Sequence, residues 1–163
     1  MHRSATRLSS GPPSPTGGSG PRYGTGESPK YEVWEPMPIR ILVIDDDVQT
    51  TTDLKRFLER AGYEVQVEND STNALEGAHL FQPHVVILDY HMPTMHGGDV
   101  AWQLSSDPLL RGVKMIVCSG YPQSEISRAL PPARIPIVEK PIDADALLQL
   151  IRESTEDIEQ LAR

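Results

Sequence analysis

Short apolar runs alternate with amphipathic stretches from Ile39 onward. Five runs have the length and composition of strands: 41–44, 63–67, 85–88, 115–118 and 135–138. Between and after them, apolar residues recur at helical spacing over 48–61, 71–81, 98–106, 123–130 and 143–162. Gly62 is expected to end the first helix and Ser71 to cap the second. Because three strands are continuously apolar, the pattern predicts an α/β fold with a doubly wound five-stranded parallel sheet.

Residues 1–36 do not share this pattern. Gly, Pro and Ser fill 19 of the first 38 positions, and strongly apolar side chains are scattered among them. Such a segment buries too little apolar surface to offset the entropy cost of ordering it. We therefore predict a disordered leader over 1–36 and one domain over 37–163 with an extended C-terminal helix. Met37 directly precedes the first strand, so an internal start that makes the leader an upstream artefact is an equal alternative.

Charge and cysteine content narrow the possible functions. Residues 39–163 carry 11 Lys and Arg against 20 Asp and Glu, which disfavours direct binding to nucleic acid or to an anionic membrane. A single cysteine, Cys118, excludes an internal disulfide and fits a reducing cytosol. The sequence also lacks the apolar core of a secretory signal and any apolar run near the roughly 18 residues of a membrane helix. We therefore expect a cytoplasmic protein with protein partners.

Polar residues follow the predicted strands, and in such sheets ligands bind beyond the carboxyl ends of the strands. The strand ends supply three consecutive carboxylates, a fourth carboxylate, a hydroxyl and an ammonium: Asp45, Asp46, Asp47, Asp89, Ser119 and Lys140. Converging carboxylates repel by on the order of 4 kcal/mol per pair at roughly 4 Å. Mg²⁺, which prefers oxygen ligands, would offset this repulsion. Asp89 is then the candidate nucleophile, because carboxylates form aspartyl phosphates.

These residues resemble the receiver domain of two-component response regulators, which has a flavodoxin-like (βα)5 fold. The segment 41–47, ILVIDDD, is similar to that family's first strand and acidic pair, and 89–98, DYHMPTMHGG, is similar to its phospho-acceptor loop. Ser119-Gly120 and Lys140-Pro141 are similar to its hydroxyl residue and its Lys-Pro. The intervals of 43, 30 and 21 positions from Asp46 through Asp89 and Ser119 to Lys140 are those of the family. The resemblance covers about residues 39–153.

The resemblance implies that Asp89 accepts a phosphoryl group from a histidine kinase or phosphotransfer protein, with Mg²⁺ as cofactor. The metal ligands would be Asp45, Asp46, Asp89 and the backbone carbonyl of His91, with Asp45 acting mainly through water. Ser119 and Lys140 would bind the phosphoryl oxygens, and positioning with charge neutralisation would supply most of the catalysis. The Lys140-Pro141 peptide bond would be cis.

Several positions depart from the family or invite another interpretation. Ile137 stands where the family often has an aromatic residue, so an aromatic signalling switch is not expected. His91 and Tyr121 occupy the positions that flank the phosphoryl group and tune its lifetime. His91 and His96 are expected to be exposed side chains rather than zinc ligands. Apolar residues continue along the fifth helix and are expected to form part of a partner surface: Leu147, Leu148, Ile151, Ile158 and Leu161.

The leading hypothesis is a stand-alone receiver that is not a conventional enzyme. Phosphorylation of Asp89 would switch the binding of a downstream protein or pass the phosphoryl group along a relay. A haloacid-dehalogenase-like phosphatase is one alternative, although its Asp-x-Asp-x-Thr pattern would place Gln49 at the threonine position. The other alternative is a receiver-like interaction module that is never phosphorylated.

Overall fold

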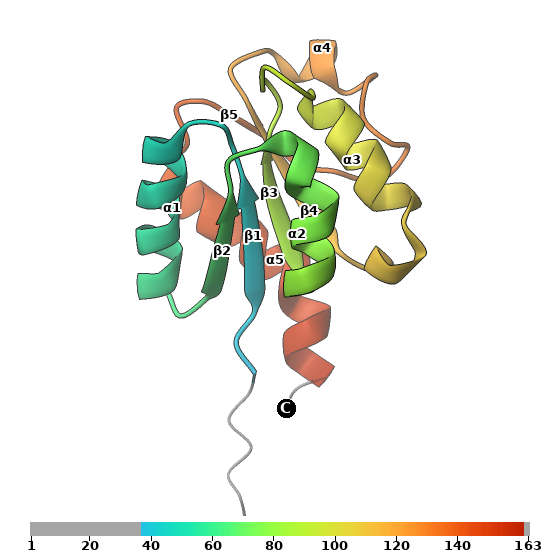
Figure 1. The fold of residues 1–163 in the computed structure, drawn as a ribbon. Helices are drawn as coiled ribbons and strands as arrows, with labels where there is room; N and C mark the ends of the chain where they lie inside the picture. Colours follow the sequence, from blue (N-terminus) through green and yellow to red (C-terminus); the bar gives the residue numbers. More distant parts are fainter. Residues whose placement is uncertain (1–36, 162–163) are drawn as a thin grey trace, which may run out of the picture. The chain divides into compact units, whose positions relative to one another are not determined.

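The computed structural model describes residues 37–161, whose strands form one parallel sheet (Figure 1). The strands lie in the order β2-β1-β3-β4-β5. Their bounds are Arg40–Ile44 for β1, Glu64–Glu68 for β2, Val85–Asp89 for β3, Lys114–Ser119 for β4 and Ile137–Glu139 for β5. This confirms the predicted doubly wound sheet. The strand order reverses between β1 and β3, which is where such folds place their ligands.

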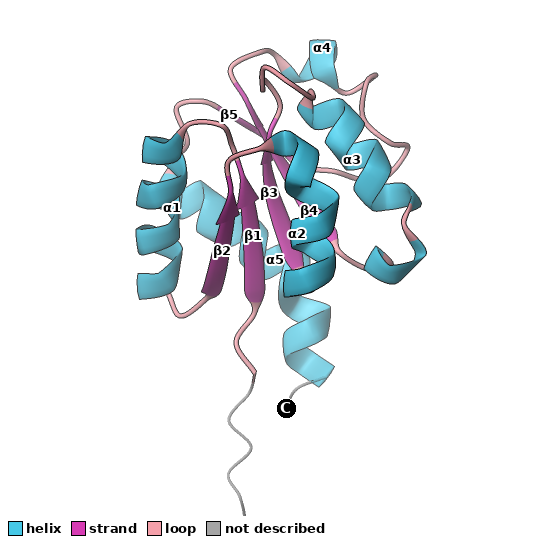
Figure 2. Cartoon of the chain, in the orientation of Figure 1, coloured by secondary structure: helices cyan, strands magenta, loops and turns pink. Residues whose placement is uncertain are grey.

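Helices cover both faces of the sheet (Figure 2). Their bounds are Val48–Arg60 for α1, Ala74–Phe81 for α2, Gly97–Ser106 for α3, Gln123–Ile126 for α4 and Ala144–Leu161 for α5. Two 3₁₀ turns, Ser71–Asn73 and Pro108–Leu110, precede α2 and β4. None of the helices in this part of the chain has the length and hydropathy of a membrane span. The predicted leader, 1–36, lies outside the described residues.

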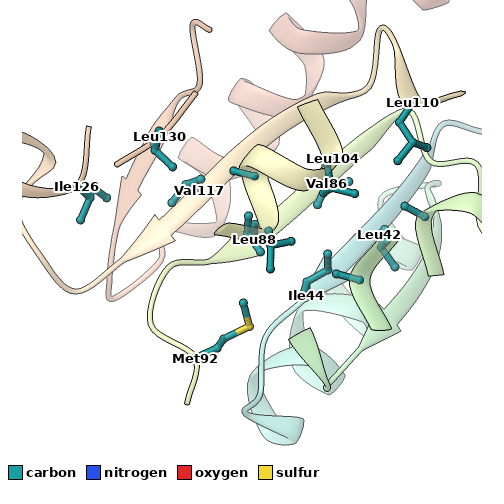
Figure 3. Packing of buried hydrophobic residues seen from close by; sticks show 14 residues of the cluster. Leu42, Ile44, Val86, Leu88, Met92, Leu104, Leu110, Val117, Ile126 and Leu130 are labelled. Atoms are coloured by element: carbon teal, nitrogen blue, oxygen red, sulfur yellow. The ribbon is translucent and has the colours of Figure 1, made fainter. Parts of the chain in front are cut away.

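Two apolar cores lie on opposite faces of the sheet, because successive strand residues point to opposite faces. Leu42 and Ile44 of β1 pack with α2, α3 and α4 in the core of Figure 3, which we call the α2–α3 core. Ile41 and Val43 of β1 pack with α1 and α5 in the other, which we call the α1–α5 core. With both faces covered, β1 and β3 are buried along almost their whole length. This fixes the sheet edge from which the polar residues emerge.

Three predicted boundaries were wrong. The predicted helix 123–130 ends at Ile126, a single turn, and turns follow it up to the pair Pro131-Pro132. The predicted strand 135–138 begins only at Ile137, since Pro136 has no N–H to donate to a ladder. Ser71 does not cap the second helix. Asp70 caps the turn there by accepting from Thr72 N–H, while Ser71 Oγ accepts from Met95 N–H at 3.1 Å.

The expectation that the apolar residues of α5 form a partner surface was also wrong for the side chains that the structure describes. Leu147 and Ile151 are fully buried, and Leu148 and Ile158 pack against the α1–α5 core. Thr155 is buried as well, with Oγ1 donating to the carbonyl of Ile151 at 2.9 Å. The second half of α5 therefore belongs to the fold.

Ile158→Ala is accordingly expected to lower the free energy of unfolding by about 1–2 kcal/mol, less than the about 2–5 kcal/mol of a fully buried site. The reason is that Ile158 is only partly buried against the α1–α5 core. Urea denaturation measures the change, with Glu156→Ala, at an exposed position of the same helix, as control. Equal stability of the two variants would show that Ile158 does not support the domain.

Candidate functional site

Four segments meet at the carboxyl edge of the sheet because all five strands are parallel. Asp45 follows β1, Asp89 ends β3, Ser119 ends β4 and Lys140 follows β5. Asp45, Asp89 and Ser119 are at most 5% exposed, whereas Asp46 is exposed. The structure thus places the sequence-predicted residues at one edge, with buried carboxylates beneath an accessible one.

The carboxylates form a cluster around one ammonium. Oxygens of Asp45, Asp46 and Asp89 all lie within 4.8 Å of one another. Lys140 Nζ lies 2.9 Å from Asp89 Oδ1 and 3.1 Å from Asp45 Oδ2. We call these four residues the acid cluster. Its ligand atoms are oxygens only, and Mg²⁺ binds one or two carboxylates together with waters and phosphate oxygens, so the residues fit that ion.

The three consecutive aspartates have three different roles. Asp45 points inward and also accepts from Asp47 N–H at 2.9 Å. Asp46 is the exposed carboxylate of the acid cluster. Asp47 is the N-cap of α1, where its carboxylate accepts from Gln49 N–H at 2.9 Å. Only the first two therefore face Asp89.

Burial raises the pKa of Asp89 above its ordinary value, and the nearby carboxylates of Asp45 and Asp46 add to the rise that Lys140 opposes. Burial alone would lower the pKa of Lys140, but its ion pairs with Asp89 and Asp45 outweigh that effect and raise it. Lys140 therefore stays charged at neutral pH. Keeping Asp89 ionised in the folded protein has a free-energy cost.

This cost predicts that Asp89→Asn stabilises the protein near neutral pH without divalent ions, by about 0.5–2 kcal/mol. A raised folded-state pKa means that the free energy of unfolding falls as pH rises from the unfolded pKa through the folded pKa. The asparagine variant lacks this fall, so the two proteins should diverge with rising pH. Urea denaturation in EDTA between about pH 4 and 8 measures it. A variant less stable than wild type at neutral pH would contradict this.

The acceptor loop between β3 and α3 is held against the sheet. Gly97 N–H donates to the carbonyl of Tyr90 at 2.9 Å, and Met92 is buried in the α2–α3 core. A Cβ at Gly97 would lie 2.3 Å from the backbone oxygen of Asp89, so only glycine permits this close return. The Met-Pro and Met-x-Gly of the loop thus have a packing role that positions Asp89.

The loops after β4 and β5 are tied to each other. Ser119 Oγ accepts from Tyr121 N–H at 2.9 Å, and the carbonyl of Ser119 accepts from Lys140 N–H at 2.8 Å. The Lys140-Pro141 bond is cis, as expected. Ile137, three positions before Lys140, is partly buried against the α2–α3 core. The hydroxyl and the ammonium are therefore anchored by one backbone contact.

Other single side chains near the site can also be compared with what the sequence indicated. His91 and His96 are exposed, as expected, with ring centroids 5.8 Å apart. Cys118 is buried, and its burial raises the pKa of the thiol to about 12, consistent with an inert core residue. The sequence did not single out Asn69, whose amide donates to the carbonyl of Asp45 at 2.7 Å and to Thr51 Oγ1 at 2.9 Å. No local pattern could have revealed Asn69, since Asp45 is 24 positions away.

Comparison with known proteins finds similar sequences among bacterial regulatory proteins. The transcriptional regulatory protein PdtaR of Mycobacterium tuberculosis is 30% identical over 117 residues, which are 71% of this chain and 50% of that protein. The response regulator MprA of Mycobacterium sp. (strain KMS) is 41% identical over 70 residues, 43% of this chain and 30% of that protein. The chain thus spans only 30% to 50% of the length of these relatives.

Solved structures show the same fold. A CheY-like response regulator receiver domain protein from Methanospirillum hungatei matches with a TM-score of 0.66 and 26% identity, over 76% of this chain and 98% of that one. The family model of the response regulator receiver domain matches residues 41–152. This chain therefore belongs to the response regulator receiver domain family.

Proposed function

We propose that Asp89 accepts a phosphoryl group in an Mg²⁺-dependent reaction, from a histidine kinase or phosphotransfer protein in the cytoplasm. The observation that carries the proposal is the acid cluster, in which Asp89 shares Lys140 with Asp45 while Asp46 stays accessible. One carboxylate can thus become covalently modified while the others remain to bind Mg²⁺ and the ammonium remains to neutralise charge.

In this reaction a carboxylate oxygen of Asp89 attacks phosphorus, forming the O–P bond as the P–N bond to the donor histidine breaks. The freed imidazole nitrogen takes the departing electron pair. Asp45, Asp46 and Asp89, with the backbone carbonyl of His91, would hold Mg²⁺, which would neutralise charge on the phosphoryl oxygens. Lys140 moves its ion pair from Asp89 to the phosphoryl group, and the Ser119 hydroxyl donates a hydrogen bond to it.

The downstream effect would be a change in protein binding or onward phosphotransfer. The acidic excess of residues 39–163 disfavours direct DNA contact and leaves protein partners. We propose that the domain assists its own phosphorylation and dephosphorylation without being a conventional enzyme. Against the haloacid-dehalogenase alternative, Asp47 would be the second aspartate of that pattern, yet its carboxylate caps α1.

A labelling experiment separates the three functions. The protein is incubated with Mg²⁺ and either acetyl phosphate or an aryl phosphate ester. A receiver gains one hydroxylamine-sensitive phosphoryl group from acetyl phosphate and does not turn over the ester. Sustained ester hydrolysis would instead support the phosphatase, and no labelling by acetyl phosphate would support the unphosphorylated interaction module.

A further inference from the structure

A cavity of about 400 Å³ lies between the acceptor loop, the start of α3 and α4. Figure 1 shows α4 and the start of α3 at the same end of the sheet. Four aromatic or imidazole rings and two carboxylates line it: Tyr90, His91, His96, Tyr121, Asp99 and Glu125. The acid cluster does not contribute to its lining. This cavity is therefore a candidate site that adjoins the acceptor site through His91 and has its own lining.

Three of the rings form one wall of the cavity. The ring centroids of His91 and Tyr121 lie 5.7 Å apart at 49°, and those of His91 and His96 lie 5.8 Å apart at 46°. His91 and Tyr121 are exposed, Tyr121 to 45%. Such tilted rings leave their faces free to stack on a planar ligand group. The wall thus offers ring faces rather than a filled apolar core.

The charged residues that line the cavity favour a positively charged ligand. Asp99 and Glu125 are exposed carboxylates, and neither lysine nor arginine is among the residues that line the cavity. Ring faces carry negative electrostatic potential and attract cations, most often arginine. A guanidinium is planar and can stack on a ring while it donates to a carboxylate in a fork. Ring faces and carboxylates together therefore suit arginine.

The floor of the cavity is preformed. A Cβ at Gly98 would lie 3.2 Å from the backbone oxygen of Ala129 and 3.6 Å from Tyr90 Cε2, so the glycine leaves room there. Trp102 Nε1 donates to that same oxygen of Ala129 at 3.1 Å, which ties the segment after α4 to α3. Trp102 itself is 48% exposed. A preformed site loses less entropy on binding.

We propose that this cavity receives an arginine side chain of a partner protein. Exposed rings at its rim can contact the peptide on either side of the arginine. An arginine within a peptide has neither the α-ammonium nor the α-carboxylate of free arginine, so its guanidinium is the only charge that it brings to the cavity. The inference goes beyond phosphorylation of Asp89 and does not depend on it. An arginine bound in this cavity would contact both the acceptor loop and the loop after β4.

The test is a titration of the full chain, labelled with ¹⁵N, by N-acetyl-arginine amide without Mg²⁺ or phosphodonor. N-acetyl-citrulline amide, which has the same shape without the charge, is the matched control probe. The titrations are run at about pH 8. We expect saturable amide shifts at Gly98, Asp99 and Tyr121 and about tenfold tighter binding of the arginine probe.

Two variants assign the binding to the proposed groups. The double variant Asp99→Asn, Glu125→Gln should lose about tenfold in affinity for the arginine probe, and Tyr121→Leu about threefold. Glu156→Gln, at an exposed position of α5, should change nothing. Equal affinity for the arginine and citrulline probes, shifts centred on the acid cluster, or tighter binding of free arginine than of the capped probe would each overturn the proposal.

Discussion

Replacing Lys140 by methionine is expected to slow the phosphorylation of Asp89 by about two to three orders of magnitude. Lys140 Nζ lies 2.9 Å from Asp89 and 3.1 Å from Asp45, so it is the fixed positive charge closest to the accepting oxygen. Methionine keeps most of the length of the side chain, being one atom shorter, and removes the charge. The rate of label incorporation from acetyl phosphate at saturating Mg²⁺ measures the loss.

Lys114→Met is the matched control for this experiment. Lys114 also forms an ion pair, 3.3 Å from Asp157, but that pair is largely exposed and lies at the opposite end of β4. The control variant should therefore be labelled at the wild-type rate. Loss of less than about threefold in Lys140→Met would mean that the ammonium pairs with the carboxylates only at rest.

Mg²⁺ at about a hundred times its dissociation constant is expected to raise the free energy of unfolding by about 2.7 kcal/mol. The stabilisation arises because the folded chain brings three carboxylates within 4.8 Å and the unfolded chain does not. Asp46→Asn, which removes the exposed carboxylate of the cluster, should abolish most of the effect. Guanidinium chloride denaturation with and without Mg²⁺ measures both proteins.

Asp53→Asn is the control, because Asp53 is an exposed carboxylate on α1 outside the acid cluster. It should retain the full stabilisation by Mg²⁺. If Asp46→Asn were stabilised as much as wild type, the ion would not be bound at this cluster.

The sheet and the convergence of the site could be predicted because both depend on local pattern and chain direction. Continuous apolar runs such as 85–88 can be buried only beneath helices on both faces. Once the strands are parallel, the residues after β1, β3, β4 and β5 must emerge at one edge. The convergence of Asp45, Asp46, Asp89 and Lys140 at this edge therefore followed from the parallel direction of the strands.

The remaining details depend on tertiary contacts that spacing does not encode. Apolar residues of α5 looked surplus to a sheet of short strands, yet Ile158 packs on the α1–α5 core. Ser71 is a residue type that commonly caps helices, but its hydroxyl accepts a hydrogen bond from Met95 N–H of the acceptor loop. Asp45 points inward, Asp46 is exposed and Asp47 caps α1, and this difference depends on where α1 begins. Spacing could not assign those roles.

Intact mass spectrometry of wild type and Asp89→Asn tests most directly whether Asp89 is the phospho-acceptor. Both proteins are treated with acetyl phosphate and Mg²⁺, with an EDTA-treated sample as control. We expect one added phosphoryl group on wild type and none on Asp89→Asn or in EDTA. Equal labelling of Asp89→Asn and wild type would contradict it.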